Sequence, residues 1–196
     1  MVTEKSRAHY ALVSRLKRAG LPFYDLVQGS PATECGIILT TAEEALALSG
    51  AGAILALEDL DDDPEVFMGQ VVSKLDGTSQ EIRVGVDPGK RIGLAVFYGE
   101  KKLGTHTHHS PASVAAKVAA FSAGIPSSEI VVRVGNGDRS AARKLVESIH
   151  GEAPRARIEL VDESGTSLRT RRAKGIPLDQ SSASRIAFRK GSTALP

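Results

Sequence analysis

The segment from Arg83 to Val96, which reads RVGVDPGKRIGLAV, constrains the fold of this chain more than any other. Two apolar runs flank a Pro-Gly turn, and this arrangement predicts a β-hairpin. Asp87 stands where the first run ends. A carboxylate at the end of a buried strand is costly unless it has a partner, so Asp87 is a candidate functional residue. An Asp that only hydrogen-bonds the turn backbone fits this pattern equally well.

Apolar periodicity extends the hairpin into an α/β domain. Strands are expected at 82–87, 92–98, 101–108, 129–134 and 157–161, and helices at 111–121, 138–149 and 178–189. Three consecutive strands followed by alternating helices and strands predict an antiparallel meander that crossovers extend into a mixed five-stranded sheet. Helices should cover both faces of this sheet.

A smaller α/β domain is expected at 1–78, before the main domain at 79–196. Its helices are predicted at 7–19, at 41–49 and from 64 onward, and its strands at 23–27, 36–40 and 53–57. Three consecutive aspartates, 61–63, precede Pro64. We interpret them as a helix N-terminus, which acids and proline favour, rather than as a metal site.

The two parts of the chain carry opposite charge. Residues 1–76 hold 6 basic and 12 acidic side chains, a net charge of −6, whereas the remainder holds 19 and 11, a net charge of +8. A basic domain favours polyanions, nucleic acid above all, although a solvated basic surface is the simpler alternative. Three roles stay open for residues 1–78: recruiting a protein partner, shielding the basic part, or forming a homodimer.

Composition also bears on the compartment. The chain has one cysteine, Cys35, so it forms no internal disulfide. Its N-terminus lacks the apolar core of a signal peptide, and no apolar run approaches the length of a membrane span. We therefore expect a cytoplasmic protein with no membrane partner.

Acidic residues recur where elements of the main domain end or begin. Asp87 ends the first strand, Asp162 and Glu163 follow the fifth, and Asp179 opens the final helix. Sites in α/β folds are usually built at such strand ends. Converging carboxylates repel one another unless a cation neutralises them, and oxygen ligands select Mg²⁺ or Mn²⁺. The alternative is that each acid is a turn or cap residue.

Four motifs in order resemble the RuvC/YqgF branch of the RNase H-like nucleases. They are the segment VGVDPGKRIGLA at 84–95, the turn VGNGD at 134–138, the segment LVDESGTS at 160–167, and Lys174-Gly175 followed by DQSSASRI at 179–186. The second motif also resembles YqgF-like domains of Tex-type transcription accessory proteins. The resemblance covers roughly residues 82–190 and implies an RNase H-like sheet.

The resemblance implies a Mg²⁺- or Mn²⁺-dependent nuclease that hydrolyses phosphodiester bonds in branched DNA, such as a Holliday junction, or in precursor rRNA. Asp87, Glu163 and Asp179 would be the catalytic, metal-binding carboxylates, supported by Asp162 and Asp138. Ser164 departs from the arginine that the family places after the glutamate. The alternative is a non-catalytic nucleic-acid-binding module of transcription or RNA processing.

Basic and amide side chains near these acids are candidates for nucleic-acid binding. Asn136 lies in a turn before a helix, where backbone N–H groups can hold a phosphate, although Asp138 is equally suited to capping that helix. A basic loop beside a carboxylate site suits a nucleic-acid backbone, and a solvated loop is the alternative. The remaining candidates are Lys90, Arg91, Arg169, Arg171, Arg172 and Lys174.

Three further patterns indicate other functions more weakly. His106 and His108 would point to one side of a strand and His109 to the other, so we expect an exposed sheet edge rather than a metal cluster. The segment 85–90 is one residue too short for a P-loop, and Arg91 replaces its Ser or Thr. An actin-like ATPase would need a second copy of the hairpin, which residues 1–76 do not contain.

Overall fold

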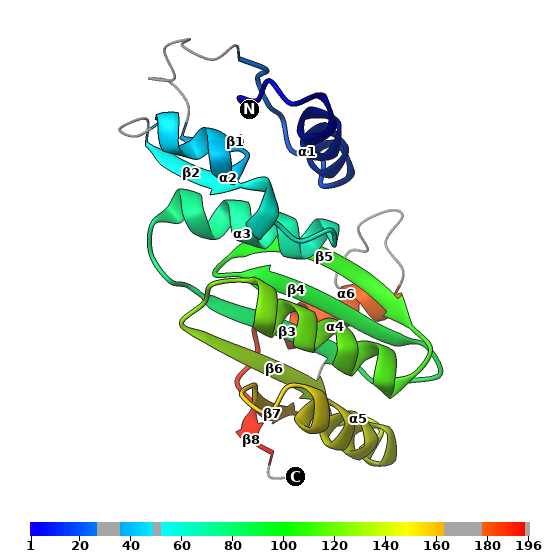
Figure 1. Ribbon diagram of the computed structural model, residues 1–196. Coiled ribbons are helices and arrows are strands. Elements are labelled where there is room, and N and C mark those ends of the chain that lie inside the picture. The colour runs from blue at the N-terminus through cyan, green and yellow to red at the C-terminus, as the bar shows by residue number, and fades with distance from the viewer. Residues whose placement is uncertain (27–35, 49–51, 163–177, 195–196) are drawn as a thin grey trace. The chain divides into compact units, whose positions relative to one another are not determined.

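The computed structural model describes residues 1–26, 36–48, 52–162 and 178–194 (Figure 1). They divide into two compact units, Met1–Ser79 and Gln80–Pro196. Within the described residues, no helix combines the length and the apolar character that a membrane crossing requires.

The first unit is a small α/β assembly. Its elements are α1 (Ser6–Arg18), β1 (Ile37–Thr40), α2 (Ala42–Ala45), β2 (Ala53–Ala56) and α3 (Pro64–Asp76), with 3₁₀ turns at Leu46–Leu48 and Leu57–Asp59. β1 and β2 pair in parallel. The core is mostly aliphatic, and its most buried members include Leu12, Leu16, Leu39 and Phe67.

The strand expected at 23–27 is wrong for the described part of that range. Leu26 forms only an isolated parallel bridge with Val2. The backbone N–H of Leu26 donates to the Met1 carbonyl, and the amino group of Met1 donates to the Tyr24 carbonyl. The described part of this segment is therefore held by hydrogen bonds to Met1 and by the bridge to Val2, and it is not a strand.

The acidic run before α3 is a helix N-terminus, as predicted. Asp63 is the N-cap, and its carboxylate accepts hydrogen bonds from the N–H groups of Glu65 and Val66 at 3.0 and 3.2 Å. Asp62 instead pairs with Arg15 of α1. These contacts give two of the aspartates structural partners within the unit.

Hydrogen bonds near the start of α2 hold the side chain of Glu44 in its ionised form. Burial alone would raise its pKa, but the N–H of Glu4, the hydroxyls of Thr3 and Thr41, and the N–H of Thr41 outweigh burial and lower the pKa to about 2. A carboxyl whose folded-state pKa is depressed stabilises the fold above the unfolded pKa, and this contribution is lost as pH falls through the folded pKa.

We expect Glu44→Gln to lower the free energy of unfolding by about 1.5 kcal/mol at pH 7, the lower end of the range for hydrogen bonds to a charged group. The deficit should shrink as pH falls from about 4.5 toward about 2, because the wild-type carboxylate then becomes protonated. Urea unfolding of both proteins at several pH values measures this difference. Glu4→Gln is the control, because it removes an exposed carboxylate and keeps the backbone N–H that donates to Glu44. A deficit that is constant with pH contradicts the prediction.

The second unit contains a six-stranded mixed sheet. Its elements are β3 (Glu81–Asp87), β4 (Ile92–Tyr98), β5 (Lys101–His108), α4 (Pro111–Gly124), β6 (Glu129–Gly135), α5 (Arg139–Glu152), β7 (Arg157–Val161), α6 (Leu178–Ile186) and β8 (Ser192–Thr193). The strand order is β5-β4-β3-β6-β7-β8. β3, β4 and β5 form an antiparallel meander, whereas β3, β6 and β7 run parallel.

The predicted α/β class and mixed sheet are confirmed, but the count of five strands is wrong. β8 pairs antiparallel with β7 through only two residues, Ser192 and Thr193. A strand of that length gives no period-2 signal in the sequence. β8 forms because β7 has a free edge within the sheet, with which these two residues can pair.

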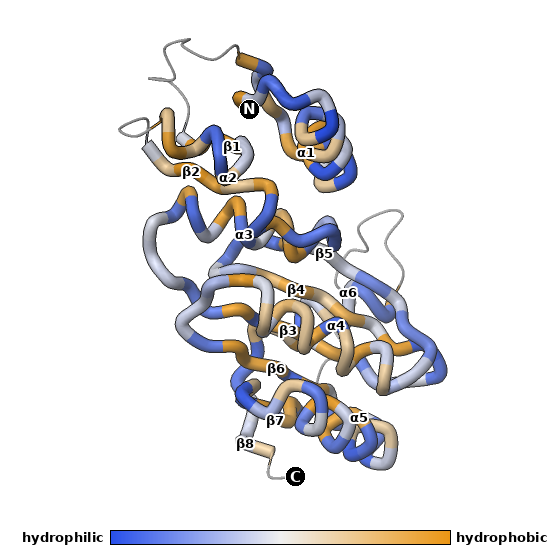
Figure 2. Tube along the Cα trace, viewed as in Figure 1, coloured by the Kyte–Doolittle hydropathy of each residue, from blue (hydrophilic) through white to orange (hydrophobic). Residues whose placement is uncertain are grey.

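Helices cover both faces of the sheet, with α4 and α5 on one face and α6 on the other (Figure 1). Val84, Val86 and Leu94 point to the face under α4 and are fully buried. The apolar colour of β4 and β6 in Figure 2 reflects this core. α6 ends three residues before the predicted position 189, and the Ala187 carbonyl there accepts a hydrogen bond from Arg133.

Candidate functional site

Three of the predicted site residues lie at the carboxyl ends of the parallel strands. Asp87 is the last residue of β3, Asn136 follows β6, and Asp162 follows β7. The backbone N–H of Asn136 donates to the Val161 carbonyl at 2.9 Å, so the ends of β6 and β7 lie side by side. With neighbouring strands about 5 Å apart, Asp87 and Asp162 lie two strands apart on one edge. Asp87 is half-buried and Asp162 is exposed.

Asp87 faces the side of the sheet that α6 covers. It pairs with Gly93 of β4, and Gly93 pairs in turn with Thr107 of β5. Directly opposed residues of antiparallel strands point to the same face. Asp87 and Thr107 therefore flank Gly93 on one face, at the end of the sheet where β3 finishes.

The first turn of α6 lies directly on Gly93. A Cβ atom placed on Gly93 would come within 2.1 Å of the Asp179 carbonyl oxygen. One helical turn further on, a Cβ on Gly85 would come within 2.0 Å of the Ala183 carbonyl oxygen. The two glycines thus let the backbone of α6 touch β3 and β4, and they place Asp179 on the same face as Asp87.

Asp179 is fixed by neighbours on β5 and the hairpin turn. Its Oδ2 accepts a hydrogen bond from the Thr107 hydroxyl at 2.6 Å, and the Arg91 Nε lies 3.9 Å away. The next residue, Gln180, accepts from the Thr105 hydroxyl at 3.1 Å and donates to Thr107 at 3.3 Å. The helix start is therefore tied to the edge strand by side chains as well as by packing.

Asp179 is held in its ionised form by these contacts. Its side chain is 15% exposed, and partial burial would raise its pKa. The Thr107 hydroxyl, the N–H groups of Gln180 and Asp179, and the Arg91 charge outweigh burial, so the pKa of Asp179 lies below its ordinary value. A carboxylate that is charged at neutral pH is available to a cation.

The described carboxylates have the chemistry that Mg²⁺ requires. Mg²⁺ prefers oxygen ligands and is usually bound by one or two carboxylates together with waters and substrate phosphates. Asp87 and Asp179 supply two carboxylates on one face of one sheet edge. Among residues 1–26, 36–48, 52–162 and 178–194, no three His, Cys, Asp or Glu side chains are clustered closely enough to hold a metal ion. Glu163, predicted as the third ligand, lies outside the described residues.

Asp138 is a helix cap in this structure. Its Oδ1 accepts a hydrogen bond from the Ala141 N–H at 3.0 Å, which starts α5. The residue is exposed and borders a cavity of about 220 Å³ together with Gly89 and Lys144. The sequence allowed Asp138 to support the metal site or to cap a helix. The hydrogen bond to Ala141 supports capping.

The predicted nucleic-acid-binding residues fall into two groups. Lys90 and Arg91 are exposed in the turn between β3 and β4, next to Asp87, and Asn136 lies at the same edge of the sheet. The described part of the site thus has positive charge beside its carboxylates. The rest of the predicted group lies outside the described residues: Arg169, Arg171, Arg172 and Lys174.

The three histidines lie on or just after β5, which is an edge strand as expected, but they are not equally exposed. His109 is exposed, whereas His106 and His108 are half-buried and their Nε2 atoms are buried. His108 exchanges a hydrogen bond with Ser113 of α4 at 3.1 Å. Burial lowers the pKa of His108, and the nearby His106, Lys117 and His109 lower it further. A neutral imidazole packed under α4 is structural.

Sequence reasoning did not identify Thr107 or Gln180, which hold the start of α6. A threonine on an edge strand gives no signal of such a role, because its partner is 72 residues away in the chain. Gly85 and Gly93 did carry a signal. Glycine inside a strand often marks the close approach of another backbone, and both glycines interrupt otherwise apolar runs.

The chain matches no protein-family model and no curated protein sequence.

Proposed function

We propose that this chain is a Mg²⁺-dependent nuclease with an RNase H-like second unit, acting on structured nucleic acid. The placement of Asp87 and Asp179 on one face of one sheet edge supports this proposal most directly. The order of the strands, a meander followed by parallel crossovers, also supports it. Branched DNA and precursor rRNA are the substrates to test first.

Asp87 and Asp179 would hold the metal, with Glu163 as the third carboxylate that the motif resemblance implies. When bound, divalent cations of this kind activate a water and offset the charge that develops on a phosphodiester. Lys90 and Arg91 would contact the nucleic-acid backbone beside the carboxylates, because both are exposed in the adjoining turn. Thr107 would keep Asp179 ionised and oriented.

The direct test incubates the purified full chain with four-way DNA junctions and with precursor rRNA fragments. Each substrate is offered Mg²⁺, Mn²⁺ or a chelator. We expect cleavage of at least one substrate with either metal and none with the chelator. Salt-sensitive binding without cleavage, lost when Arg169, Arg171 and Arg172 are replaced together, would instead indicate a binding module. Neither binding nor cleavage would reject both functions.

Thr107 is expected to act as a positioning residue for Asp179. Thr107→Val removes the 2.6 Å hydrogen bond, so the pKa of Asp179 should rise and its orientation should loosen. Partners that orient metal ligands typically affect metal affinity by about 10- to 100-fold. We therefore expect Thr107→Val to need at least about tenfold more Mg²⁺ for half-maximal cleavage.

A titration of the cleavage rate against Mg²⁺ concentration measures this effect. Thr107→Ser, which keeps the hydroxyl, should restore the wild-type Mg²⁺ requirement. A Thr107→Val protein that is slower at every Mg²⁺ concentration, with an unchanged midpoint, would show that Thr107 does not act on the metal site.

A further inference from the structure

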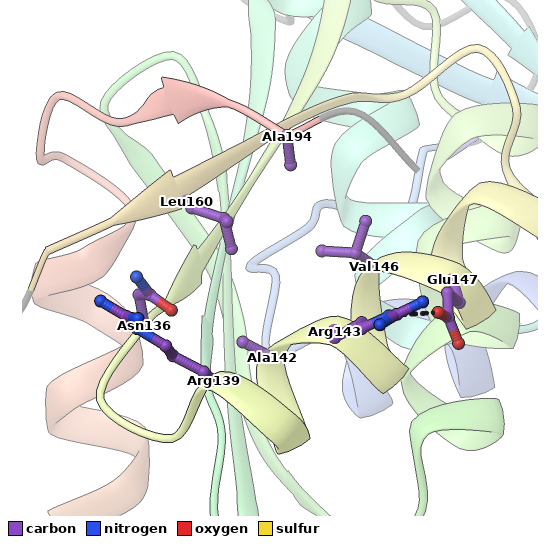
Figure 3. Close-up of a pocket in the computed structure, with 8 residues that line it drawn as sticks. All are labelled: Asn136, Arg139, Ala142, Arg143, Val146, Glu147, Leu160 and Ala194. Carbon is purple, nitrogen blue, oxygen red and sulfur yellow. Dashed lines mark hydrogen bonds and ion pairs between the residues drawn. The ribbon is translucent and has the colours of Figure 1, made fainter.

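A second feature of the carboxyl edge is a pocket of about 410 Å³ between α5 and the sheet (Figure 3). Its middle is apolar: Ala142 and Val146 come from α5, Leu160 from β7, and Ala194 follows β8. Ligand pockets commonly have volumes of about 300–1,000 Å³ and apolar walls with a few polar groups. The pocket therefore has the size and the walls of a small-ligand site.

Polar groups stand at the two ends of this pocket (Figure 3). One end carries Arg143, whose Nε is paired with Glu147 at 2.8 Å, so its charge is already balanced. The other end carries Asn136 and Arg139. Neither of their side chains makes a hydrogen bond or ion pair with any part of the chain that the structure describes. Among the described residues, an amide and a guanidinium without an ion-pair partner thus stand at one end of an apolar wall.

The position of the pocket connects it with the carboxylates. Asn136 follows β6, which lies between β3 and β7 in the sheet. The Asp87 end of β3 is therefore one strand away, about 5 Å along the sheet. Asp87 and Asp179 lie on the α6 face of the sheet, whereas the pocket lies on the α5 face. A nucleic acid that crosses this edge, with its backbone at the carboxylates, would reach the mouth of the pocket on the other face.

We infer that this pocket receives one unpaired nucleobase of the substrate. The inference rests on the proposed nucleic-acid substrate and specifies how that substrate is chosen. A base is flat and apolar on its faces, which suits the aliphatic wall, and it has hydrogen-bonding groups on its edge, which suit the Asn136 amide. The guanidinium of Arg139 suits the adjoining phosphate. Adenine is the best match, because asparagine can contact it through two hydrogen bonds.

The consequence is a preference for nucleic acid with a bulge, loop or branch. A fully paired duplex keeps its bases stacked, and extracting one from the duplex is costly, whereas an unpaired base is free to enter the pocket. Base-binding pockets therefore select structure as well as chemistry. Such a pocket would hold an unpaired nucleotide at the edge of the sheet that also carries the carboxylates.

The test measures binding without cleavage, in the presence of a chelator. The probes are two DNA stems of equal length, one fully paired and one with a single bulged 2-aminopurine, a fluorescent adenine analogue that is quenched when stacked. We expect the full-length chain to bind the bulged stem at least about tenfold more tightly than the paired stem, because extracting a paired base costs affinity on that scale. Fluorescence should rise on binding, because all the side chains that line the pocket are non-aromatic.

Ala194→Trp fills the pocket and should abolish both the preference and the fluorescence rise. The backbone N–H of Ala194, which donates to the Ile158 carbonyl, is kept in this variant. Thr193→Trp is the matched control: Thr193 is exposed, is adjacent in sequence, and opposes Glu159 rather than Leu160, so it faces away from the pocket. The control should behave as wild type, and thermal unfolding of both variants checks that they fold.

The outcomes separate this inference from the proposed function. Equal binding of both stems, or an Ala194→Trp protein that keeps the preference, overturns the base pocket while nucleic-acid binding stands. A bulge preference that Ala194→Trp removes supports the pocket even if no metal supports cleavage. Failure to bind either stem, as DNA or as RNA of the same sequence, rejects the substrate class and the pocket together. A change of oligomeric state in Ala194→Trp, with unchanged binding, would instead identify a contact between copies.

Discussion

Asp87→Asn should lower the rate of Mg²⁺-dependent cleavage by about three orders of magnitude. The substitution replaces a carboxylate oxygen by an amide nitrogen, which cannot bind a cation. Metal stabilisation of a phosphodiester transition state is worth several kcal/mol, and each 1.36 kcal/mol corresponds to a factor of ten in rate. Asparagine has the same shape as aspartate, so the half-buried position at the end of β3 should still fold.

A control variant must show that the loss of cleavage comes from the metal site and not from the removal of one negative charge. Glu100→Gln is the control, because Glu100 is exposed in the turn between β4 and β5, at the opposite end of the sheet from the β3–β4 turn. It also removes one negative charge, and it should cleave as wild type does. Single-turnover rates with saturating protein compare the variants at the chemical step. An Asp87→Asn protein that retains the wild-type rate would reject metal catalysis at this edge.

The prediction of Asp87 shows what a local pattern can establish. The hairpin is visible in sequence because its two strands are adjacent, with β4 buried throughout and β3 buried at four of its seven positions. Asp87 ends one of these strands, so its place at the carboxyl edge follows from the position of the strand alone. The same reasoning places Asn136 and Asp162, each of which follows a parallel strand.

What the sequence did not show depends on contacts between distant segments. Asp179 was predicted to open a helix, but which strands that helix covers depends on Gly85 and Gly93, about 90 residues earlier. The role of Thr107 depends on the same docking. The partly buried pair Arg133–Glu159, at 2.8 Å, joins the middles of two strands whose register no sequence pattern fixes. The docking of α6 and the position of Asp179 therefore depend on packing between segments that are distant in the sequence.

The largest effect on stability is expected where α6 touches the sheet. In Gly93→Ala the new methyl would lie 2.1 Å from the Asp179 carbonyl oxygen and 2.4 Å from its carbon. Both are backbone atoms, so no side chain can rotate away and the whole helix must move. Overpacking in a core costs about 1–3 kcal/mol and occasionally more. We expect about 3 kcal/mol for Gly93→Ala, a large part of the 5–15 kcal/mol typical of a domain.

Gly151→Ala is the matched control for this prediction. Gly151 lies in α5, and a Cβ there would meet nothing within 4 Å. Alanine in a helix is better than glycine by roughly 0.5–1 kcal/mol, so the same chemical change should stabilise the second unit slightly. Urea unfolding should therefore show a lower free energy of unfolding for Gly93→Ala and a slightly higher one for Gly151→Ala, each relative to wild type.

Gly93→Ala also displaces Asp179, so it should raise the Mg²⁺ requirement for cleavage as well. Equal stability of Gly93→Ala and wild type would mean that α6 does not rest on β4, and Asp179 would then lose its place beside Asp87.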